Sequence, residues 1–343
     1  MNPKTEGYFF PAEWADHRAT WLSFPHNLDT WEDRLPRIYP AYLQFIKSLS
    51  LHERVCIAVG NPQTRATIED QLAKYDVDQS RVDLFDFPTN DSWCRDHGPS
   101  FVVNKNTGKK AIVNWGYNAW GGKYPPFDSD DALPKNVAEA FALPLFEPEI
   151  ILEGGSVEFN GAGTLMTSKS CLLNPNRNPH LNQKEIEEKL RDFYNVEQVL
   201  WLEEGIVGDD TDGHVDDMTR FVNSDTVITA IESNRLDDNY APLHENLSLL
   251  KKMQLTNGQK LNIVELPMPD PVMDHGLRLP ASYANFYIAN KQVIVPTYRC
   301  KKDDEALRII GSCFPDREII GIDSTEIIWG LGSFHCLSQQ EPL

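Results

Sequence analysis

Paired cysteines are missing from this 343-residue sequence. Its six cysteines stand singly, with no CxxC pair, at positions 56, 94, 171, 300, 313 and 336. Structural zinc sites and disulfide frameworks both need cysteines at characteristic spacings, so this pattern argues against either. We therefore expect reduced thiols in a reducing compartment.

Long apolar runs are also missing. No stretch approaches the ~18 consecutive apolar residues that a membrane-spanning helix requires. Residues 1–6 lack the basic start and the apolar stretch of a signal peptide. These absences predict a cytoplasmic protein with no membrane partner, and the hydrophobic content of 41% is ample for a sizeable core.

Basic residues are few, since 32 lysines and arginines stand against 51 aspartates and glutamates, for a formal net charge of −19. Binding to nucleic acid needs a basic face, so the charge argues against that partner. An acidic field attracts small cations instead. Acidity that serves only solubility accounts for the same composition.

Short apolar runs bounded by turn-forming residues predict strands, and amphipathic segments predict helices. The predicted strands are 55–59, 82–87, 100–103, 111–115, 149–152, 164–167, 199–202, 218–222, 226–230, 261–266, 285–289, 293–296 and 318–322. The predicted helices are 34–51, 62–74, 132–141, 183–193, 241–253 and 303–313. They follow a β-β-α-β rhythm, about every 60 residues. No linker divides the chain, so we expect one radial or layered α/β domain over residues 1–343.

The segment Gly330–Ser338 carries Cys336 after a glycine-spaced approach, in which backbone can come close to a ligand. A thiol on such a segment is a candidate nucleophile, whereas a small buried hydrophobe is the alternative. His335 cannot be its base through adjacency, because successive side chains of a strand face opposite ways. The base must come from another part of the chain.

The loop 90–99 combines polar residues with an aromatic side chain. Trp93 is suited to stack on a planar cation, and a carboxylate such as Asp96 can accept two of its N–H bonds. The alternative is an ion pair of Arg95 with Asp96 or Asp91 that stitches a turn. A second aromatic loop, 115–123, contains Trp120 and either walls a pocket or caps the core.

Two acidic segments complete the candidate site. Glu153 follows a strand-like run and precedes two glycines, a position where ligand sites gather, although an exposed edge acid fits as well. In the segment 208–221, five acids surround His214. In a strand, His214 and Asp216 would share a face, as a general acid/base beside a cation-binding carboxylate. The crowded acids would raise the pKa of the imidazole and favour a thiolate nearby.

A metal interpretation of this acidic segment also stays open. An EF-hand is excluded, because Gly208 and Thr219 would occupy positions that need Asp and Glu. His214 and Asp216 with a distant histidine, such as His244 or His275, would instead resemble the facial triad of a non-haem iron enzyme.

Several ordered motifs resemble the agmatine deiminase family, within the peptidyl-arginine deiminase-like superfamily of guanidino-group-modifying (pentein) enzymes. The resemblance runs nearly end to end and rests on 11–14 (PAEW), 93–99 (WCRDHGP), 117–122 (YNAWGG), 153–156 (EGGS), 173–179 (LNPNRNP), 210–216 (DTDGHVD), 283–287 (YANFY), and His335-Cys336 followed by Gln339-Gln340. It implies a five-bladed pseudo-symmetric α/β-propeller and no metal or organic cofactor.

The resemblance also implies roles for individual residues. Cys336 would attack the guanidinium carbon, and His214 would protonate the departing ammonia and later activate water. Asp96 and Asp216 would hold the guanidinium, and Glu153 would orient the site. The substrate-binding residues that we expect are Trp93, Trp120, Asp210, Thr211 and Gly332.

The predicted reaction is hydrolysis of agmatine to N-carbamoylputrescine and ammonia through a covalent thiouronium intermediate, a step of putrescine biosynthesis. The loop 330–334 replaces the glycine run that is usual in the family, which keeps peptidyl-arginine or another substituted guanidine as an alternative substrate. The iron oxygenase and a catalytically silent guanidine-binding protein are the remaining alternatives. Whether copies assemble into a homo-oligomer is left open.

Overall fold

One chain path recurs in four sheets of the computed structural model, which describes residues 2–343. An antiparallel strand pair leads into a helix and then into a third strand, which pairs in parallel with the second. The first such unit is β5 (Ser100–Asn104), β6 (Lys110–Val113), α6 (Asp128–Ala140) and β7 (Leu145–Phe146). The other three of this form are β8 (Val157–Phe159), β9 (Thr164–Ser168), α8 (Gln183–Tyr194) and β10 (Gln198–Leu202); β11 (Thr219–Phe221), β12 (Thr226–Ile231), α9 (Tyr240–Leu250) and β13 (Asn262–Pro267); and β16 (Tyr287–Ala289), β17 (Gln292–Thr297), α10 (Asp303–Cys313) and β18 (Glu318–Asp323).

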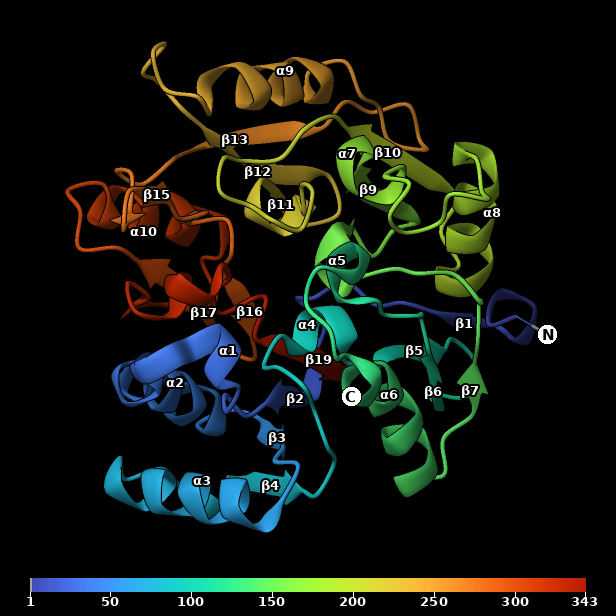
Figure 1. Ribbon diagram of the computed structural model, residues 1–343. Helices are drawn as coiled ribbons and strands as arrows, with labels where there is room; N and C mark the ends of the chain where they lie inside the picture. The colour runs from blue at the N-terminus through green and yellow to red at the C-terminus, as the bar shows by residue number, and fades with distance from the viewer. Residues whose placement is uncertain (1) are drawn as a thin grey trace.

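The fifth sheet joins the two ends of the chain. Its order is β19 (Ser338–Pro342), β2 (His17–Ser23), β3 (Arg54–Ala58) and β4 (Val82–Phe85), with α2 (Leu35–Ser50) and α3 (Pro62–Lys74) between its parallel strands. The short strand β1 (Tyr8–Phe9) extends the β5 sheet, and β14 (Met273–Asp274) and β15 (Leu277–Arg278) form a separate hairpin. Figure 1 shows β19 near the middle of the molecule, with α3, α6, α8 and α9 on its outside.

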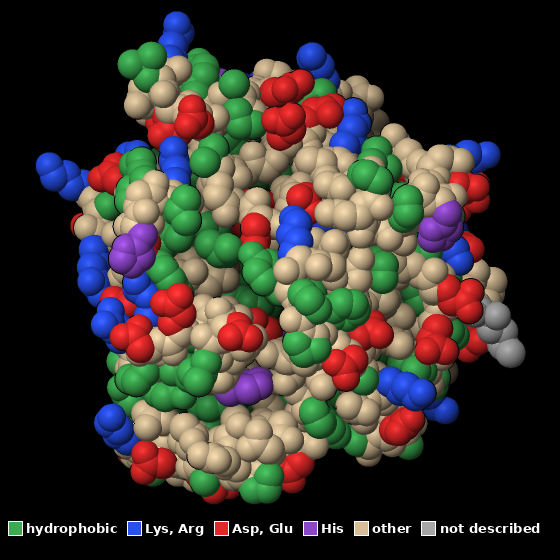
Figure 2. Space-filling view, in the orientation of Figure 1, with side chains coloured by type: hydrophobic (Ala, Val, Ile, Leu, Met, Phe, Trp, Pro, Cys, Tyr) green, Lys and Arg blue, Asp and Glu red, His purple; other side chains and the backbone are tan. Residues whose placement is uncertain are grey.

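The predicted mixed α/β fold is therefore confirmed. None of the sheets found in residues 2–343 closes on itself, so the five-bladed propeller and the single domain stay predictions. Within the same residues, no helix has both the length and the apolar character needed to cross a membrane. Acidic and basic side chains are interspersed over the face seen in Figure 2.

Local sequence signals explain the helices that were predicted best. Helix α3 begins with Pro62 directly after Asn61, whose side chain accepts hydrogen bonds from the first turn. Helix α8 begins with a capping box in which Asn182 and Glu185 satisfy each other's backbone N–H groups. Both helices begin at the residue that these caps predict.

Some predicted elements differ from the structure. The segment 149–152 is no strand and contributes only one isolated bridge, from Ile151 to Gly116. Strand β19 was missed because its side chains are polar although all five are buried. Glu341 explains how they are tolerated: its carboxylate accepts from Lys110 Nζ (2.6 Å), Arg18 Nη1 (2.8 Å) and Trp21 Nε1 (3.0 Å).

Glu341→Ala should therefore lower the free energy of unfolding by about 2–4 kcal/mol, because it leaves a buried indole N–H and the Arg18 guanidinium without their acceptor and removes one of the two acceptors of Lys110. Urea unfolding followed by tryptophan fluorescence measures the loss. Glu318→Ala, at an exposed position of β18, is the matched control and should stay within about 0.5 kcal/mol of wild type. A loss at Glu341 no larger than that of the control would contradict the assigned role.

Candidate active site

Glycines let the segment Gly330–Ser338, which carries Cys336, pack closely against the Trp93 ring. It follows the short helix η6 (Ile327–Gly330), and Leu331 turns the chain with a positive φ of 71°. A Cβ on Gly332 would lie 2.5 Å from the Trp93 ring and 2.9 Å from Cys336 Cβ, so no larger residue fits there. Trp93 and Gly332, both predicted to bind substrate, thus lie beside Cys336.

Asn285 fixes the thiol from the other side. Its Nδ2 donates to Cys336 Sγ (2.9 Å), and its Oδ1 accepts from the backbone N–H of Cys336 (3.2 Å). The same Nδ2 lies 2.9 Å from Asp217 Oδ1. Sequence analysis gave Asn285 no role beyond its motif. The available signal was an asparagine at the first position of the predicted apolar strand 285–289.

Three predicted catalytic side chains converge on Gly155. Asp96 lies on α4 (Cys94–His97), Gly155 on η4 (Gly154–Ser156), and His214 directly precedes η5 (Val215–Asp217). A Cβ on Gly155 would lie 2.6 Å from His214 Nδ1, 2.8 Å from Asp96 Oδ1 and 3.0 Å from Asp216 Oδ2. Strand alternation does not bring His214 and Asp216 together, because the 3₁₀ turn η5 begins directly after His214 and contains Asp216. They nevertheless enter the same site.

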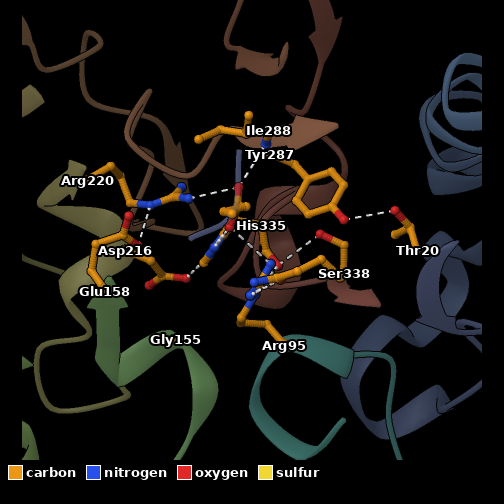
Figure 3. A network of polar contacts seen from close by, with 12 residues as sticks. Thr20, Arg95, Gly155, Glu158, Asp216, Arg220, Tyr287, Ile288, His335 and Ser338 are labelled. Carbon is orange, nitrogen blue, oxygen red and sulfur yellow. Dashed lines mark hydrogen bonds and ion pairs between the residues drawn. The ribbon is translucent and has the colours of Figure 1, made fainter. Parts of the chain in front are cut away.

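His335 forms a buried bridge between two carboxylates. Its Nδ1 lies 2.6 Å from Asp216 Oδ2, and its Nε2 lies 2.8 Å from Glu13 Oε2. Arg220 extends the network, at 3.0 Å from Glu13 Oε1 and 2.9 Å from Glu158 Oε2. Figure 3 shows His335 between the Asp216–Arg220 side and Arg95. A neutral imidazole has one N–H, so only the protonated ring donates to both carboxylates. Because both ring nitrogens are occupied, His335 is no base for Cys336.

Asp96 does not form an ion pair with its neighbour Arg95. Arg95 instead donates to Gln340 Oε1 (2.7 Å) and Glu13 Oε2 (3.3 Å), so the alternative of a local ion pair is wrong. Asp96 Oδ2 accepts from Trp120 Nε1 (2.9 Å), and its Oδ1 accepts from Gly155 N–H (2.9 Å). Trp120 therefore borders the site and orients this carboxylate.

Glu153 is a fully buried acid and not an edge residue. Its Oε1 accepts from Arg177 Nε (2.8 Å), whose Nη2 donates to the Thr211 carbonyl (2.8 Å). Thr211 Oγ1 accepts from the backbone N–H of His214 (3.2 Å), so Thr211 supports His214. Its predicted substrate contact stays a prediction. Asp210 is partly exposed and pairs with the Tyr124 hydroxyl.

The burial of several acids sets the protonation states. Burial raises the pKa of Asp96 to about 6, against the lowering effect of His214. Burial alone would lower the pKa of His214, but Asp96, Cys171 and Asp216 raise it well above the usual value, as predicted. Burial, Asp216 and Asp217 also raise the pKa of the Cys336 thiol. Burial and these carboxylates thus oppose the thiolate that a protonated imidazole nearby was expected to favour.

Several buried atoms of the site lack a hydrogen-bond partner among residues 2–343. They are Asp216 Oδ1, Glu153 Oε2 and both ring nitrogens of His214. An unsatisfied buried polar atom costs about 1–3 kcal/mol, so these atoms are suited to a polar ligand. With the acids nearby, the site is suited to a cation with several N–H donors.

The iron-binding alternative does not fit the described part of the chain. Among residues 2–343, no histidine joins His214 and Asp216 in a ligand cluster. His244 instead bonds to the Glu232 carbonyl (3.2 Å), and the side chain of His275 is 82% exposed. The facial-triad prediction is therefore wrong.

The comparisons with known proteins agree with this architecture. A family model described as Porphyromonas-type peptidyl-arginine deiminase matches residues 9–342, and the chain belongs to this family.

The individual relatives narrow the class to agmatine deiminases. The agmatine deiminase of Medicago truncatula is 35% identical over 99% of this chain and 98% of its own. The solved agmatine deiminase of Enterococcus faecalis is 32% identical, covers 99% of this chain and 97% of its own, and has a TM-score of 0.92. A cysteine-to-serine variant of the C. jejuni agmatine deiminase with substrate bound is 33% identical, covers 97% and 96%, and has a TM-score of 0.88.

A titration of the thiol tests the electrostatics of the site. The thiolate absorbance near 240 nm, taken as wild type minus Cys336→Ser, should not rise until the pH exceeds the usual thiol pKa of 9.0. The reason is that burial and the neighbouring carboxylates disfavour the negative charge of a Cys336 thiolate. A midpoint near neutral pH would contradict the assignment.

Proposed function

We propose that this protein is an agmatine deiminase, which hydrolyses agmatine to N-carbamoylputrescine and ammonia as a step of putrescine biosynthesis. The observation that carries the proposal is the set of buried polar atoms of Asp216 and His214 that have no hydrogen-bond partner among residues 2–343, next to Asp96 and Cys336. The agmatine deiminases among the similar proteins support the choice of substrate.

Substrate binding would use the two aspartates as a pair of acceptors. A guanidinium carries a planar fork of N–H donors that matches carboxylate geometry. Asp96, aligned by Trp120, and Asp216, held by His335, offer such acceptors from two sides. Because the bound cation places a positive charge near Cys336, it lowers the thiol pKa. The thiolate thus forms when substrate arrives, and its proton leaves to solvent.

The reaction then proceeds in two displacements. Cys336 Sγ attacks the guanidinium carbon and forms the C–S bond, with Asn285 Nδ2 stabilising the sulfur until it reacts. Protonated His214 gives its proton to the departing nitrogen, the C–N bond breaks and ammonia leaves. Neutral His214 accepts a proton from water as the water attacks the thiouronium carbon. The C–S bond breaks, the ureido product leaves, and Cys336 is regenerated.

Other residues position these groups or shape the pocket. Glu153, held by Arg177, orients the neighbourhood of His214. Trp93 and Trp120 line the pocket around the guanidinium end of the substrate.

Asp210 and Thr211 lie on the loop before His214, where the carboxylate of Asp210 suits the terminal amine of agmatine. Lys123 binds Asp212 (2.9 Å) as well as the Asp210 carbonyl, so its charge is not free for a substrate carboxylate.

The fold proposal is a five-bladed propeller in a single catalytic domain. Support comes from the repeated strand–strand–helix–strand order of four sheets, from the related sheet β19–β2–β3–β4, and from the placement of these sheets around the centre of the molecule (Figure 1). A crystal structure in which one of these sheets packed away from the others would overturn it.

The activity test is ammonia release from purified protein. Wild type should convert agmatine and form a ureido product. Cys336→Ala should lose at least about 10³-fold in kcat, since it lacks the nucleophile. The matched control is Cys313→Ser, a partly buried thiol of α10, which should retain activity. Undiminished turnover by Cys336→Ala would reject the mechanism.

A substrate panel tests the choice of agmatine. Free arginine and an arginine peptide should react with at least about 10-fold lower kcat/KM than agmatine, because Asp210 suits a terminal amine, repels the carboxylate of free arginine and finds no such amine on an internal arginine of a peptide. Faster turnover of the peptide would assign the enzyme to peptidyl-arginine instead.

A further inference from the structure

A second kind of ligand set overlaps the candidate active site. Glu153, Cys171 and His214 each offer one ligand atom, and these atoms all lie within 4.8 Å of one another. Glu153 directly precedes η4, Cys171 lies on α7 (Lys169–Leu172), and His214 precedes η5. All three side chains are at most 1% exposed. The reaction proposed above uses Glu153 and His214 but has no use for Cys171.

Two of the three side chains carry ligand atoms without a hydrogen-bond partner among residues 2–343. Glu153 Oε2 and both ring nitrogens of His214 are buried and have no hydrogen-bond partner in the described part of the chain. Glu153 Oε1 is held by Arg177 Nε at 2.8 Å, which leaves Oε2 as the free oxygen. Asp96 Oδ1 lies 3.7 Å from His214 Nδ1 and helps to orient the ring. Such outer contacts are what fixes the ligands of a metal site.

We propose that Glu153, Cys171 and His214 form an inhibitory site for a thiophilic divalent cation, Zn²⁺ being the best match. Zinc combines thiolate, imidazole and carboxylate ligands at roughly 2.0–2.3 Å in a tetrahedron, with water as a fourth ligand. Calcium and magnesium prefer oxygen ligands only and are poorly matched. Binding releases the protons of Cys171 and His214. The thiolate and the carboxylate then neutralise the two charges of the cation.

Occupancy of this site would remove the proposed acid and base from use. A metal-bound nitrogen of His214 can neither give a proton to ammonia nor take one from water. This inhibition rests on the function proposed for His214, whereas the binding of the metal does not. The bound cation thus inhibits the proposed reaction and is not a cofactor for it.

Cobalt provides a direct probe of the thiolate ligand, because a Co²⁺–thiolate bond absorbs in the near ultraviolet. The Cys336→Ser variant titrated with Co²⁺ should develop this band at about one equivalent, together with visible bands of tetrahedral geometry. Cys336→Ser with Cys171→Ser should lose the near-ultraviolet band. Cys336→Ser with Cys313→Ser is the matched control and should keep it. If Cys171→Ser misfolds by circular dichroism, Cys171→Ala takes its place.

Two results would overturn the proposal. A band that is absent from Cys336→Ser but present in wild type would make the nucleophile the ligand. A band that survives the loss of Cys171 would place the metal elsewhere. In activity assays, Cys171→Ser should retain turnover and need at least about 10-fold more Zn²⁺ for half inhibition. Failure of agmatine turnover in wild type, with the cobalt band intact, would reject the proposed function and leave the metal site standing.

Discussion

The buried bridge from Asp216 through His335 to Glu13 is the interaction on which the site depends. It joins the N-terminal segment, the turn after His214 and the C-terminal segment, and Arg220 ties the same Glu13 to Glu158. Removing one partner of such a buried pair leaves an uncompensated charge and costs about 3–5 kcal/mol. Because Cys336 directly follows His335, the position of the nucleophile is set by this network.

The same network explains the preference for a cation. The His335 contact keeps the pKa of Asp216 low despite burial, while its Oδ1 remains unpartnered among the described residues. Asp96 adds a second carboxylate whose pKa of about 6 leaves it mostly ionised at neutral pH. The resulting negative field raises the pKa of the Cys336 thiol. In the proposed mechanism, the charge of the substrate therefore helps to activate the nucleophile.

Much of this site could be predicted from the sequence, because Asp96, Glu153, His214 and Cys336 stand in polar, glycine-containing segments next to strands. The partners that hold them could not. Arg95 pairs with Gln340, which is 245 residues away, so a search among sequence neighbours gave the wrong ion pair. Strand β19 carries buried polar side chains and has no hydropathy signal. All strands of the sheets β11–β12–β13 and β16–β17–β18 were predicted, whereas β7 and β8, with two and three residues, were missed because such short strands show no alternation.

Intact-mass analysis of enzyme quenched with acid during agmatine turnover tests the central claim most directly. We expect a transient adduct with the mass of agmatine minus ammonia, and peptide mapping should locate it on Cys336. The adduct should disappear when substrate is exhausted. Turnover without any adduct on Cys336, under conditions that trap enzyme in the steady state, or an adduct on another residue, would contradict the proposed mechanism.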